Sequence, residues 1–206
     1  MTSRYCSQCG KAKSACICAS IVQLTAQTEV IILQHPSEVK RAMGTARILA
    51  LSLKRCHCLV GEDFSQREDL LSLLGDENYV HALLYPSDEA EVVSESWLPL
   101  EEGKQRRVIL LDGTWKKAYK MWQFAPMLHT LPCGRLPLDL SAGYRIRKPP
   151  TQNSLSTVEA GYHLLSILEP DRDFTPLLKS FEQMIEHQIQ QMPEGLYEKH
   201  YGETKR

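Results

Sequence analysis

The chain has 206 residues, 43% of them apolar, and a formal net charge of −1. This length suits one domain with a small appendage, and the composition is that of a globular protein rather than a disordered one. The sequence lacks the uninterrupted apolar run of about 18 residues that a membrane helix requires. Its first residues also lack the apolar core of a signal peptide, so we expect a cytoplasmic protein.

The charges are separated along the chain although they nearly cancel. Residues 104–148 hold ten Lys or Arg and two Asp, whereas residues 86–102 hold six acidic residues and no basic one. Such a separation lets one face attract phosphate on a chain that is not basic overall. Chance clustering on a solvated surface is the alternative.

Four of the seven cysteines stand close together at the start of the chain, in the pattern Cys6-x-x-Cys9 followed by Cys16-x-Cys18. Disulfides are rare in a reducing cytoplasm, and so short a segment hardly folds without a metal. We therefore predict a structural zinc knuckle over residues 1–22, with four thiolates that leave no open coordination position. Free thiols on an unstructured arm are the alternative.

Strand and helix signals alternate after the knuckle. Short β-branched and apolar runs predict strands at 29–34, 56–60, 80–85 and 107–111. Apolar residues at helical spacing, with capping and stop signals, predict helices at 38–53, 67–74, 114–122, 156–168 and 176–192. Buried strands that alternate with helices are typical of an α/β fold, a parallel sheet with helices on both faces. We expect this domain to span residues 23–206.

Ligands of such sheets bind beyond the carboxyl ends of the strands. Three short sequences occupy such ends, at residues 34–36, 85–87 and 112–114. In the last, Asp112 ends a buried strand, Gly113 permits a tight turn, and Thr114 can cap the next helix. Trp115 on the first turn could wall a pocket. A carboxylate that only caps the helix, beside a core tryptophan, is the alternative.

A basic stretch follows, with Arg145, Arg147 and Lys148 on an extended segment that two prolines end. Alternating cations of this kind suit a phosphate backbone, although a solvated edge is equally compatible with them. Lys116 and Lys117 follow Trp115 directly, so positive charge is expected to flank the candidate pocket.

The motifs, taken in order, resemble those of the DTW-domain family. Asp112-Gly-Thr-Trp115 is similar to the Asp-x-Thr-Trp signature that names the family. The other matching pieces are the four-cysteine knuckle, His35-Pro-Ser-Glu38 with Thr45-Ala46, Leu84-Tyr85-Pro86, Tyr144-Arg-Ile-Arg147 and Ser156-Thr-Val-Glu159-Ala160. The resemblance extends from Cys6 to about Leu168.

This resemblance implies a SPOUT-like fold in which a C-terminal trefoil knot forms the pocket for S-adenosylmethionine. It implies transfer of the 3-amino-3-carboxypropyl group of that donor to N3 of a tRNA uridine, with methylthioadenosine released. The expected uridine is at variable-loop position 47, whereas eukaryotic relatives are expected to act on the D-loop. Asp112 is the expected general base, because N3 must lose a proton before it attacks.

Further residues are expected to bind the donor and the tRNA. For S-adenosylmethionine they are Leu84, Tyr85, Pro86, Leu111, Gly113, Thr114, Trp115, Ser154, Leu155, Ser156, Thr157, Glu159 and Ala160. For tRNA they are Lys40, Arg41, Lys116, Lys117, Arg145, Arg147 and Lys148. Glu159 could instead serve only the capping box that it forms with Ser156. We expect a monomer, with a homodimer as the alternative.

Two other functions fit parts of the sequence. A SPOUT-type RNA methyltransferase would share the fold and the donor but release adenosylhomocysteine. A non-catalytic zinc-knuckle RNA-binding protein would bind tRNA and release neither by-product. A metal-dependent hydrolase is disfavoured, because the sequence has no HExxH-type motif.

Overall fold

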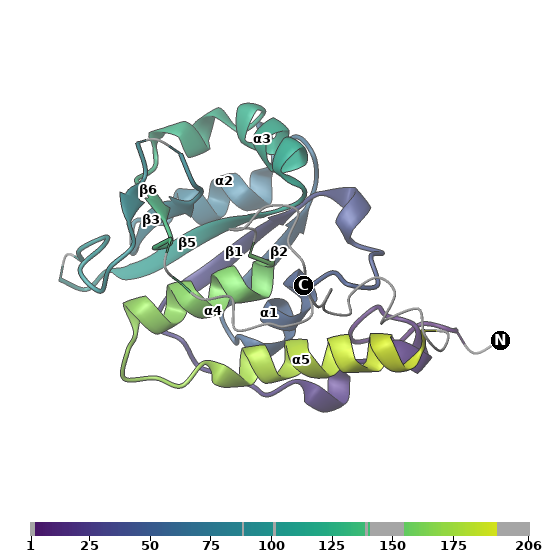
Figure 1. Ribbon diagram of the computed structural model, residues 1–206. Helices are drawn as coiled ribbons and strands as arrows, with labels where there is room; N and C mark the ends of the chain where they lie inside the picture. Colours follow the sequence, from purple (N-terminus) through teal and green to yellow (C-terminus); the bar gives the residue numbers. More distant parts are fainter. Residues whose placement is uncertain (1–2, 88, 101, 139, 141–154, 193–206) are drawn as a thin grey trace, which may run out of the picture.

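The computed structural model describes residues 3–87, 89–100, 102–138, 140 and 155–192. Within these ranges six strands form one sheet in the order β2-β1-β5-β3-β6-β4, and every pairing is parallel (Figure 1). The strands are β1 (Glu29–Gln34), β2 (Cys56–Val60), β3 (Tyr79–Leu84), β4 (Glu91–Val92), β5 (Gln105–Asp112) and β6 (Cys133–Arg135).

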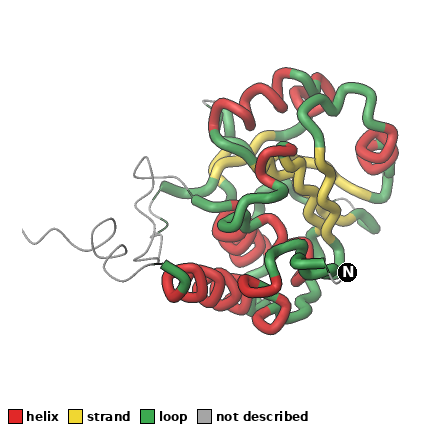
Figure 2. Tube along the Cα trace, turned by 90° about the vertical axis from the view of Figure 1, so that its right-hand side faces the viewer, coloured by secondary structure: helices red, strands yellow, loops and turns green. Residues whose placement is uncertain are grey.

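Helices cover both faces of the sheet. The α-helices are α1 (Ala46–Ser52), α2 (Glu68–Leu74), α3 (Trp115–Gln123), α4 (Thr157–Leu168) and α5 (Thr175–Gln190). Short 3₁₀ helices are η1 (Lys13–Ala15), η2 (Cys18–Ser20), η3 (Pro36–Glu38) and η4 (Pro126–Thr130). In Figure 1, α2 and α3 lie above the sheet and α1, α4 and α5 below it; Figure 2, turned by 90°, shows the strands between these layers. The predicted α/β fold with a parallel sheet covered on both faces is confirmed.

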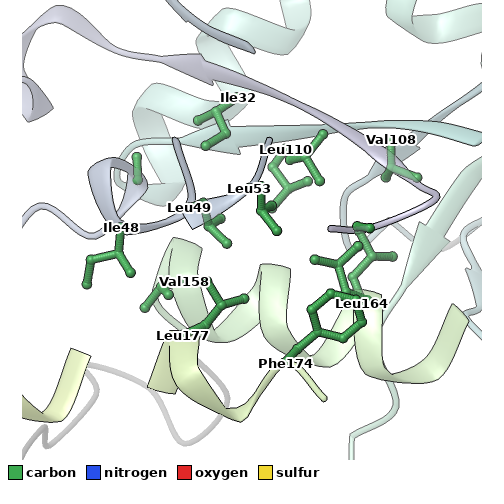
Figure 3. Close-up of a cluster of buried hydrophobic side chains, with 14 of the residues drawn as sticks. Ile32, Ile48, Leu49, Leu53, Val108, Leu110, Val158, Leu164, Phe174 and Leu177 are labelled. Carbon is green, nitrogen blue, oxygen red and sulfur yellow. The ribbon is translucent and has the colours of Figure 1, made fainter. Parts of the chain in front are cut away.

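The apolar run of β1 supplies both halves of the core. Val30 and Ile32 pack in one cluster with α1, α4 and α5, part of which is drawn in Figure 3. Ile31 and Leu33 point to the opposite face, into a second cluster with α2 and α3. Because successive side chains of a strand alternate between faces, a strand that is covered on both faces carries a continuous apolar run, here Val30–Leu33.

Helix α4 lies directly against α1. A Cβ atom added at Gly161 would lie 2.7 Å from both terminal carbons of Leu49, so a larger residue here would require the buried Leu49 side chain to move. The close packing brings the first turn of α4 to the carboxyl ends of β1 and β5, where the Val158 amide donates to the Thr45 hydroxyl at 3.3 Å.

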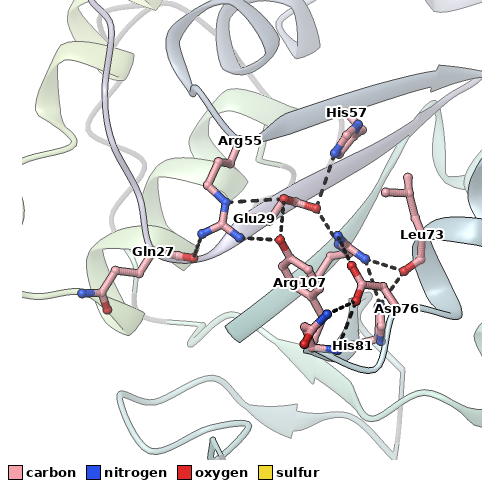
Figure 4. A network of polar contacts seen from close by, with 10 residues as sticks. Gln27, Glu29, Arg55, His57, Leu73, Asp76, His81 and Arg107 are labelled. Carbon is pink, nitrogen blue, oxygen red and sulfur yellow. Dashed lines mark hydrogen bonds and ion pairs between the residues drawn. The ribbon is translucent and has the colours of Figure 1, made fainter. Parts of the chain in front are cut away.

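A buried ion network ties the amino ends of the strands together (Figure 4). Arg107 on β5 donates to the carboxylate of Glu29, its register partner on β1. Arg55 and His57 reach the same carboxylate at 3.5 and 3.4 Å. The Arg107 guanidinium, only 3% exposed, also lies 3.5 Å from the centre of the Tyr79 ring. This edge of the sheet is therefore held together by paired charges.

The prediction of one helix over 38–53 is wrong in its first half. After η3 the chain turns twice, with the Arg41 amide bonded to the Glu38 carbonyl and the Gly44 amide to the Arg41 carbonyl, and α1 begins only at Ala46. Lys11 of the knuckle donates to the carbonyls of Ala42 and Gly44 at 2.5 and 3.2 Å, which holds this segment in its turns. Strands β4 and β6 were not predicted, because two or three residues carry no periodic signal.

The expected trefoil knot depends on the path of residues 141–154, which lie outside the described residues. In the ranges that are described, no helix has both the length and the apolar character needed to cross a membrane.

Candidate functional site

Asp112 lies between two neighbouring strands, β1 and β5, whose following connections run to opposite faces of the sheet. After β1 the chain passes to α1 on one face, and after the neighbouring β5 it passes to α3 on the other. Such a switch point opens a crevice beyond the carboxyl ends of the two strands. Asp112 ends β5 opposite Gln34, the last residue of β1.

The carboxylate of Asp112 joins three elements. It is 8% exposed; its Oδ2 accepts a hydrogen bond of 2.7 Å from the Gln34 amide nitrogen, and its Oδ1 accepts one from the Thr157 hydroxyl at the start of α4. The N-cap of α3 is Thr114, so Asp112 is held by β1 and α4 rather than used as a helix cap. Each carboxylate oxygen keeps a second lone pair, so the group can still accept a proton.

Gln34 is the partner of Asp112 that the sequence reasoning did not find. Its amide oxygen faces the Cys58 thiol at 3.9 Å. Burial, and after it the negative charge of Asp112, raises the pKa of Cys58, so this thiol stays protonated and can donate. The signal available in the sequence was a polar side chain that ends an otherwise apolar strand, at an end where ligands bind.

The predicted capping box at the start of α4 is present. The backbone amide of Ser156 donates to the Glu159 carboxylate at 2.7 Å, and the Ser156 hydroxyl donates to the same oxygen at 2.5 Å. Glu159 is buried, and both capping bonds use its Oε2 atom. Its expected contact with the donor would therefore have to be made by Oε1. Leu155 and Ala160 flank the cap and are partly buried.

A second buried carboxylate lies just beyond β1. Glu38 pairs with Lys117 at 3.1 Å and with Arg41 at 3.0 Å. A Cβ atom added at Gly113 would lie 3.2 Å from the Cβ atom of Lys117, so glycine eases the tight turn from β5 into α3. Two of the cations expected to bind tRNA are thus already engaged at the rim of the site.

The remaining predicted residues divide between the site and its surroundings. Leu84, Tyr85 and Leu111 are partly buried at the ends of β3 and β5, with Pro86 exposed beside them, and Trp115 is 51% exposed. Lys40 and Lys116 are exposed. Ser154, Arg145, Arg147 and Lys148 lie outside the described residues.

The four cysteines of the knuckle converge on one point. Their sulfur atoms lie within 4.8 Å of one another, with 3.6 Å between Cys6 and Cys18 and 3.7 Å between Cys9 and Cys16. A tetrahedral zinc with Zn–S bonds of about 2.3 Å places its sulfurs roughly 3.8 Å apart. Backbone amides, first that of Cys9, lower the pKa of Cys6 to about 6, whereas burial, with the neighbouring thiols, raises the pKa of Cys18. Cys6 is therefore the thiol of the pair that most readily becomes the thiolate that a metal requires. The cluster can therefore hold a metal ion.

The knuckle is packed on the rest of the chain. Cys9 and Ile17 are buried in the same apolar cluster as α5. Near the end of that helix, His187 contacts the Ser14 carbonyl, and Gln191 donates to it at 2.7 Å. With Lys11 bound to the segment before α1, the knuckle supports both α5 and the rim of the site.

The sequence profile of the DTW domain matches residues 3–189. The chain belongs to the DTW-domain family. It is similar to proteins named tRNA-uridine aminocarboxypropyltransferase 2 from three animals. Identity is 32% to the Drosophila melanogaster protein, over 80% of this chain and 66% of that protein. It is 29% to the Mus musculus protein and 28% to the Macaca fascicularis protein, each over 98% of this chain and 72% of the relative.

These relatives confirm the expected family and, with it, the expectation of an enzyme of the transferase class. The signature of the DTW domain has a clear place in the fold. Asp112 is the buried carboxylate between three elements, and Trp115 is the exposed first residue of α3. Thr114 occupies the N-cap position of that helix, but its side chain makes no capping hydrogen bond, so the expected side-chain cap is absent there.

Proposed function

We propose that this DTW protein transfers the 3-amino-3-carboxypropyl group of S-adenosylmethionine to N3 of a uridine in tRNA. The observation that carries the proposal is the Asp112 carboxylate, held by Gln34 and Thr157 at the switch point of a parallel sheet. The names of the relatives supply the reaction class. The proposal includes a SPOUT-like knot and a uridine at variable-loop position 47, with the D-loop as the alternative position.

The residues around Asp112 suit a cationic donor. S-adenosylmethionine supplies the transferred group on a sulfonium, and methylthioadenosine is the leaving group. Asp112, at the end of β5, offers a carboxylate beside which that sulfonium could be held. The exposed indole of Trp115 offers an aromatic face to a cation or to the adenine ring. Leu84 and Leu111 lie at the carboxyl ends of β3 and β5, the edge at which parallel α/β sheets bind their ligands.

Asp112 is also placed to remove the proton from N3. Uracil N3–H is a weak acid, and a carboxylate positioned beside it can accept the proton as the new bond to the γ-carbon forms. Gln34 and Thr157 each donate one hydrogen bond to the carboxylate, which fixes its orientation and leaves a lone pair on each oxygen to accept a proton. N3 lies on the pairing edge of the base, so the uridine must be unpaired or turned outward when it reacts.

Zinc has a structural role in this proposal. Four sulfur ligands saturate a tetrahedral ion and leave no position for a substrate. The knuckle instead supports the segment before α1, through Lys11, and the end of α5, through Ser14. The displacement at the γ-carbon needs no Lewis acid.

The deciding experiment is one incubation of the protein with S-adenosylmethionine and unmodified tRNA. We expect methylthioadenosine as the by-product and a tRNA that gains one aminocarboxypropyl group on a uridine. Adenosylhomocysteine would identify a methyltransferase, and tRNA binding without either by-product would identify a binding protein. Digestion of the product tRNA followed by mass spectrometry distinguishes the variable loop from the D-loop.

A further inference from the structure

Helix α3 carries an exposed row of aromatic side chains beside the candidate site. Trp115, Tyr119 and Trp122 recur at intervals of four and three residues, which places them on one flank of the helix. Trp115 is 51% and Tyr119 49% exposed. We call the row and its two ring neighbours the aromatic flank, which comprises Tyr85, Trp115, Tyr119, Trp122 and His129.

Three rings of the aromatic flank, those of Tyr85, Trp122 and Tyr119, form a stack. Trp122 lies in the middle, with its centre 6.1 Å from Tyr85 at an angle of 6° and 5.9 Å from Tyr119 at 28°. His129 holds the Trp122 ring from another side at 4.2 Å. Tyr119 is therefore supported on the side of Trp122 and exposed to solvent elsewhere, which preorganises it for one more flat partner.

The charges on α3 indicate which partner this is. The helix contains Lys116, Lys117 and Lys120 and no acidic residue. Lys116 is exposed on the turn that carries Trp115, and Lys120, on the turn of Tyr119, is exposed and paired with Glu62 at 2.6 Å. Exposed aromatic rings next to cations are the pattern by which proteins bind single-stranded nucleic acid, with bases on the rings and phosphates near the lysines.

We propose that the aromatic flank stacks an unpaired base of the tRNA through Tyr119, next to the uridine that reacts at Asp112. This inference rests on the proposed function, because that function supplies the RNA. Trp115 and Tyr119 are one helical turn apart, a rise of about 6 Å, so a base on Tyr119 is close to the site. A nucleoside donor fits this place poorly, because such ligands bind in concave pockets that cover most of their surface. Tyr119 stands on the outer surface of a helix.

The test measures the affinity of the full chain for tRNA over a range of salt concentrations. Tyr119→Ala is expected to weaken binding by about 5- to 150-fold, the loss that corresponds to one base–aromatic stack. Because a stack releases no counterions, the dependence of affinity on salt should keep its slope. Lys116→Ala should instead reduce that slope by about one. Tyr119→Phe keeps the ring and should bind nearly as the unmodified protein does.

Phe124→Ala is the matched control. Phe124 is also an exposed aromatic residue of this region, 45% exposed, but it lies about 140° around the helix from Tyr119. The Phe124→Ala variant should bind tRNA with the affinity of the unmodified protein. Equal losses in the two alanine variants, or normal binding by Tyr119→Ala, would overturn the inference.

Two further measurements distinguish an RNA base on the aromatic flank from the donor and from a segment of the chain itself. Methylthioadenosine binding should be the same in Tyr119→Ala and the unmodified protein; a parallel loss would assign the ring to the donor and overturn the inference. A large fall in the melting temperature of Tyr119→Ala would show that other parts of the chain pack on Tyr119, and this would also overturn the inference. If the unmodified protein binds tRNA but transfers nothing, the proposed function fails while the stacking measurement still stands. If it binds no tRNA, both fail.

Discussion

Asp112→Asn is the substitution that tests the candidate site most sharply. It keeps the size of the side chain and removes its charge. The amide oxygen of asparagine can take the hydrogen bond from Gln34, and its NH₂ group can face Thr157, whose hydroxyl accepts as well as donates. The geometry of the three elements is therefore retained, and what changes is the strength of the contacts and the ability to accept a proton.

The expected losses differ between stability and turnover. Hydrogen bonds to a charged group contribute about 1.5–3 kcal/mol and neutral ones about 0.5–1.5 kcal/mol. Two weakened bonds therefore lower the free energy of unfolding by about 2–3 kcal/mol. Loss of a positioned base lowers the rate by roughly 10²–10⁴-fold, a barrier increase of about 3–5 kcal/mol. A folded variant that binds both substrates should hence transfer very slowly.

The assay is a single-turnover reaction with saturating S-adenosylmethionine and tRNA, well below the melting temperature of the variant. Thr157→Val is the control, because it removes one hydrogen bond to the carboxylate and leaves the carboxylate in place. It should lose much less turnover than Asp112→Asn. Near-normal turnover in Asp112→Asn would refute the role of Asp112 as the base. A parallel collapse of donor affinity would make Asp112 a binding residue instead.

Three further predictions concern the rest of the chain. Purified protein should contain about one zinc per chain, and Cys9→Ser should lose it. Hydrogen exchange in this variant should rise in the knuckle and in the segment before α1 that Lys11 binds, but not in β5. Purified protein without zinc would contradict this prediction. Glu29→Ala leaves the buried Arg107 without its main partner, so urea unfolding should show a free energy of unfolding that is lower by about 3–5 kcal/mol. Glu62→Ala breaks an exposed pair with Lys120 and should change that free energy little. Burial lowers the pKa of His81 and of His163, so the unfolded chain binds more protons below about pH 6.5 and stability should fall there. A urea midpoint that does not change between pH 7.5 and 5.5 would refute this effect of the two histidines. So would an equally large fall of the midpoint in the His81→Gln, His163→Gln double variant.

The elements that could be predicted are those whose signal is local. The apolar run of β1 and the capping box of α4 lie where the sequence places them, because neighbouring residues alone determine them. The start of α1 could not be predicted in this way. Its apolar spacing continues back to residue 38, but Lys11, far away in sequence, binds the carbonyls that a helix would need.

The environment of Asp112 depends on long-range pairing. The position of Asp112 at a strand end follows from the sequence, but its partners Gln34 and Thr157 are distant in the chain. They meet only because β5 inserts between β1 and β3, and the sequence carries no local signal for that strand order. The same order creates the switch point. The sequence therefore predicts that Asp112 ends a strand, whereas its contacts with Gln34 and Thr157 could be found only in the fold.

The strand order also constrains how the chain acquires its structure. When β1 and β2 pair during synthesis, the other edge of β1 has no partner until β5, more than 70 residues later, leaves the ribosome. In that interval β1 presents the side of Val30–Leu33 as an open apolar edge, the kind of surface on which chains associate wrongly. Assembly around Asp112 must wait longer still, for Thr157. Nascent chains that end before β5 should thus be bound by chaperones, and ones that extend past α4 released.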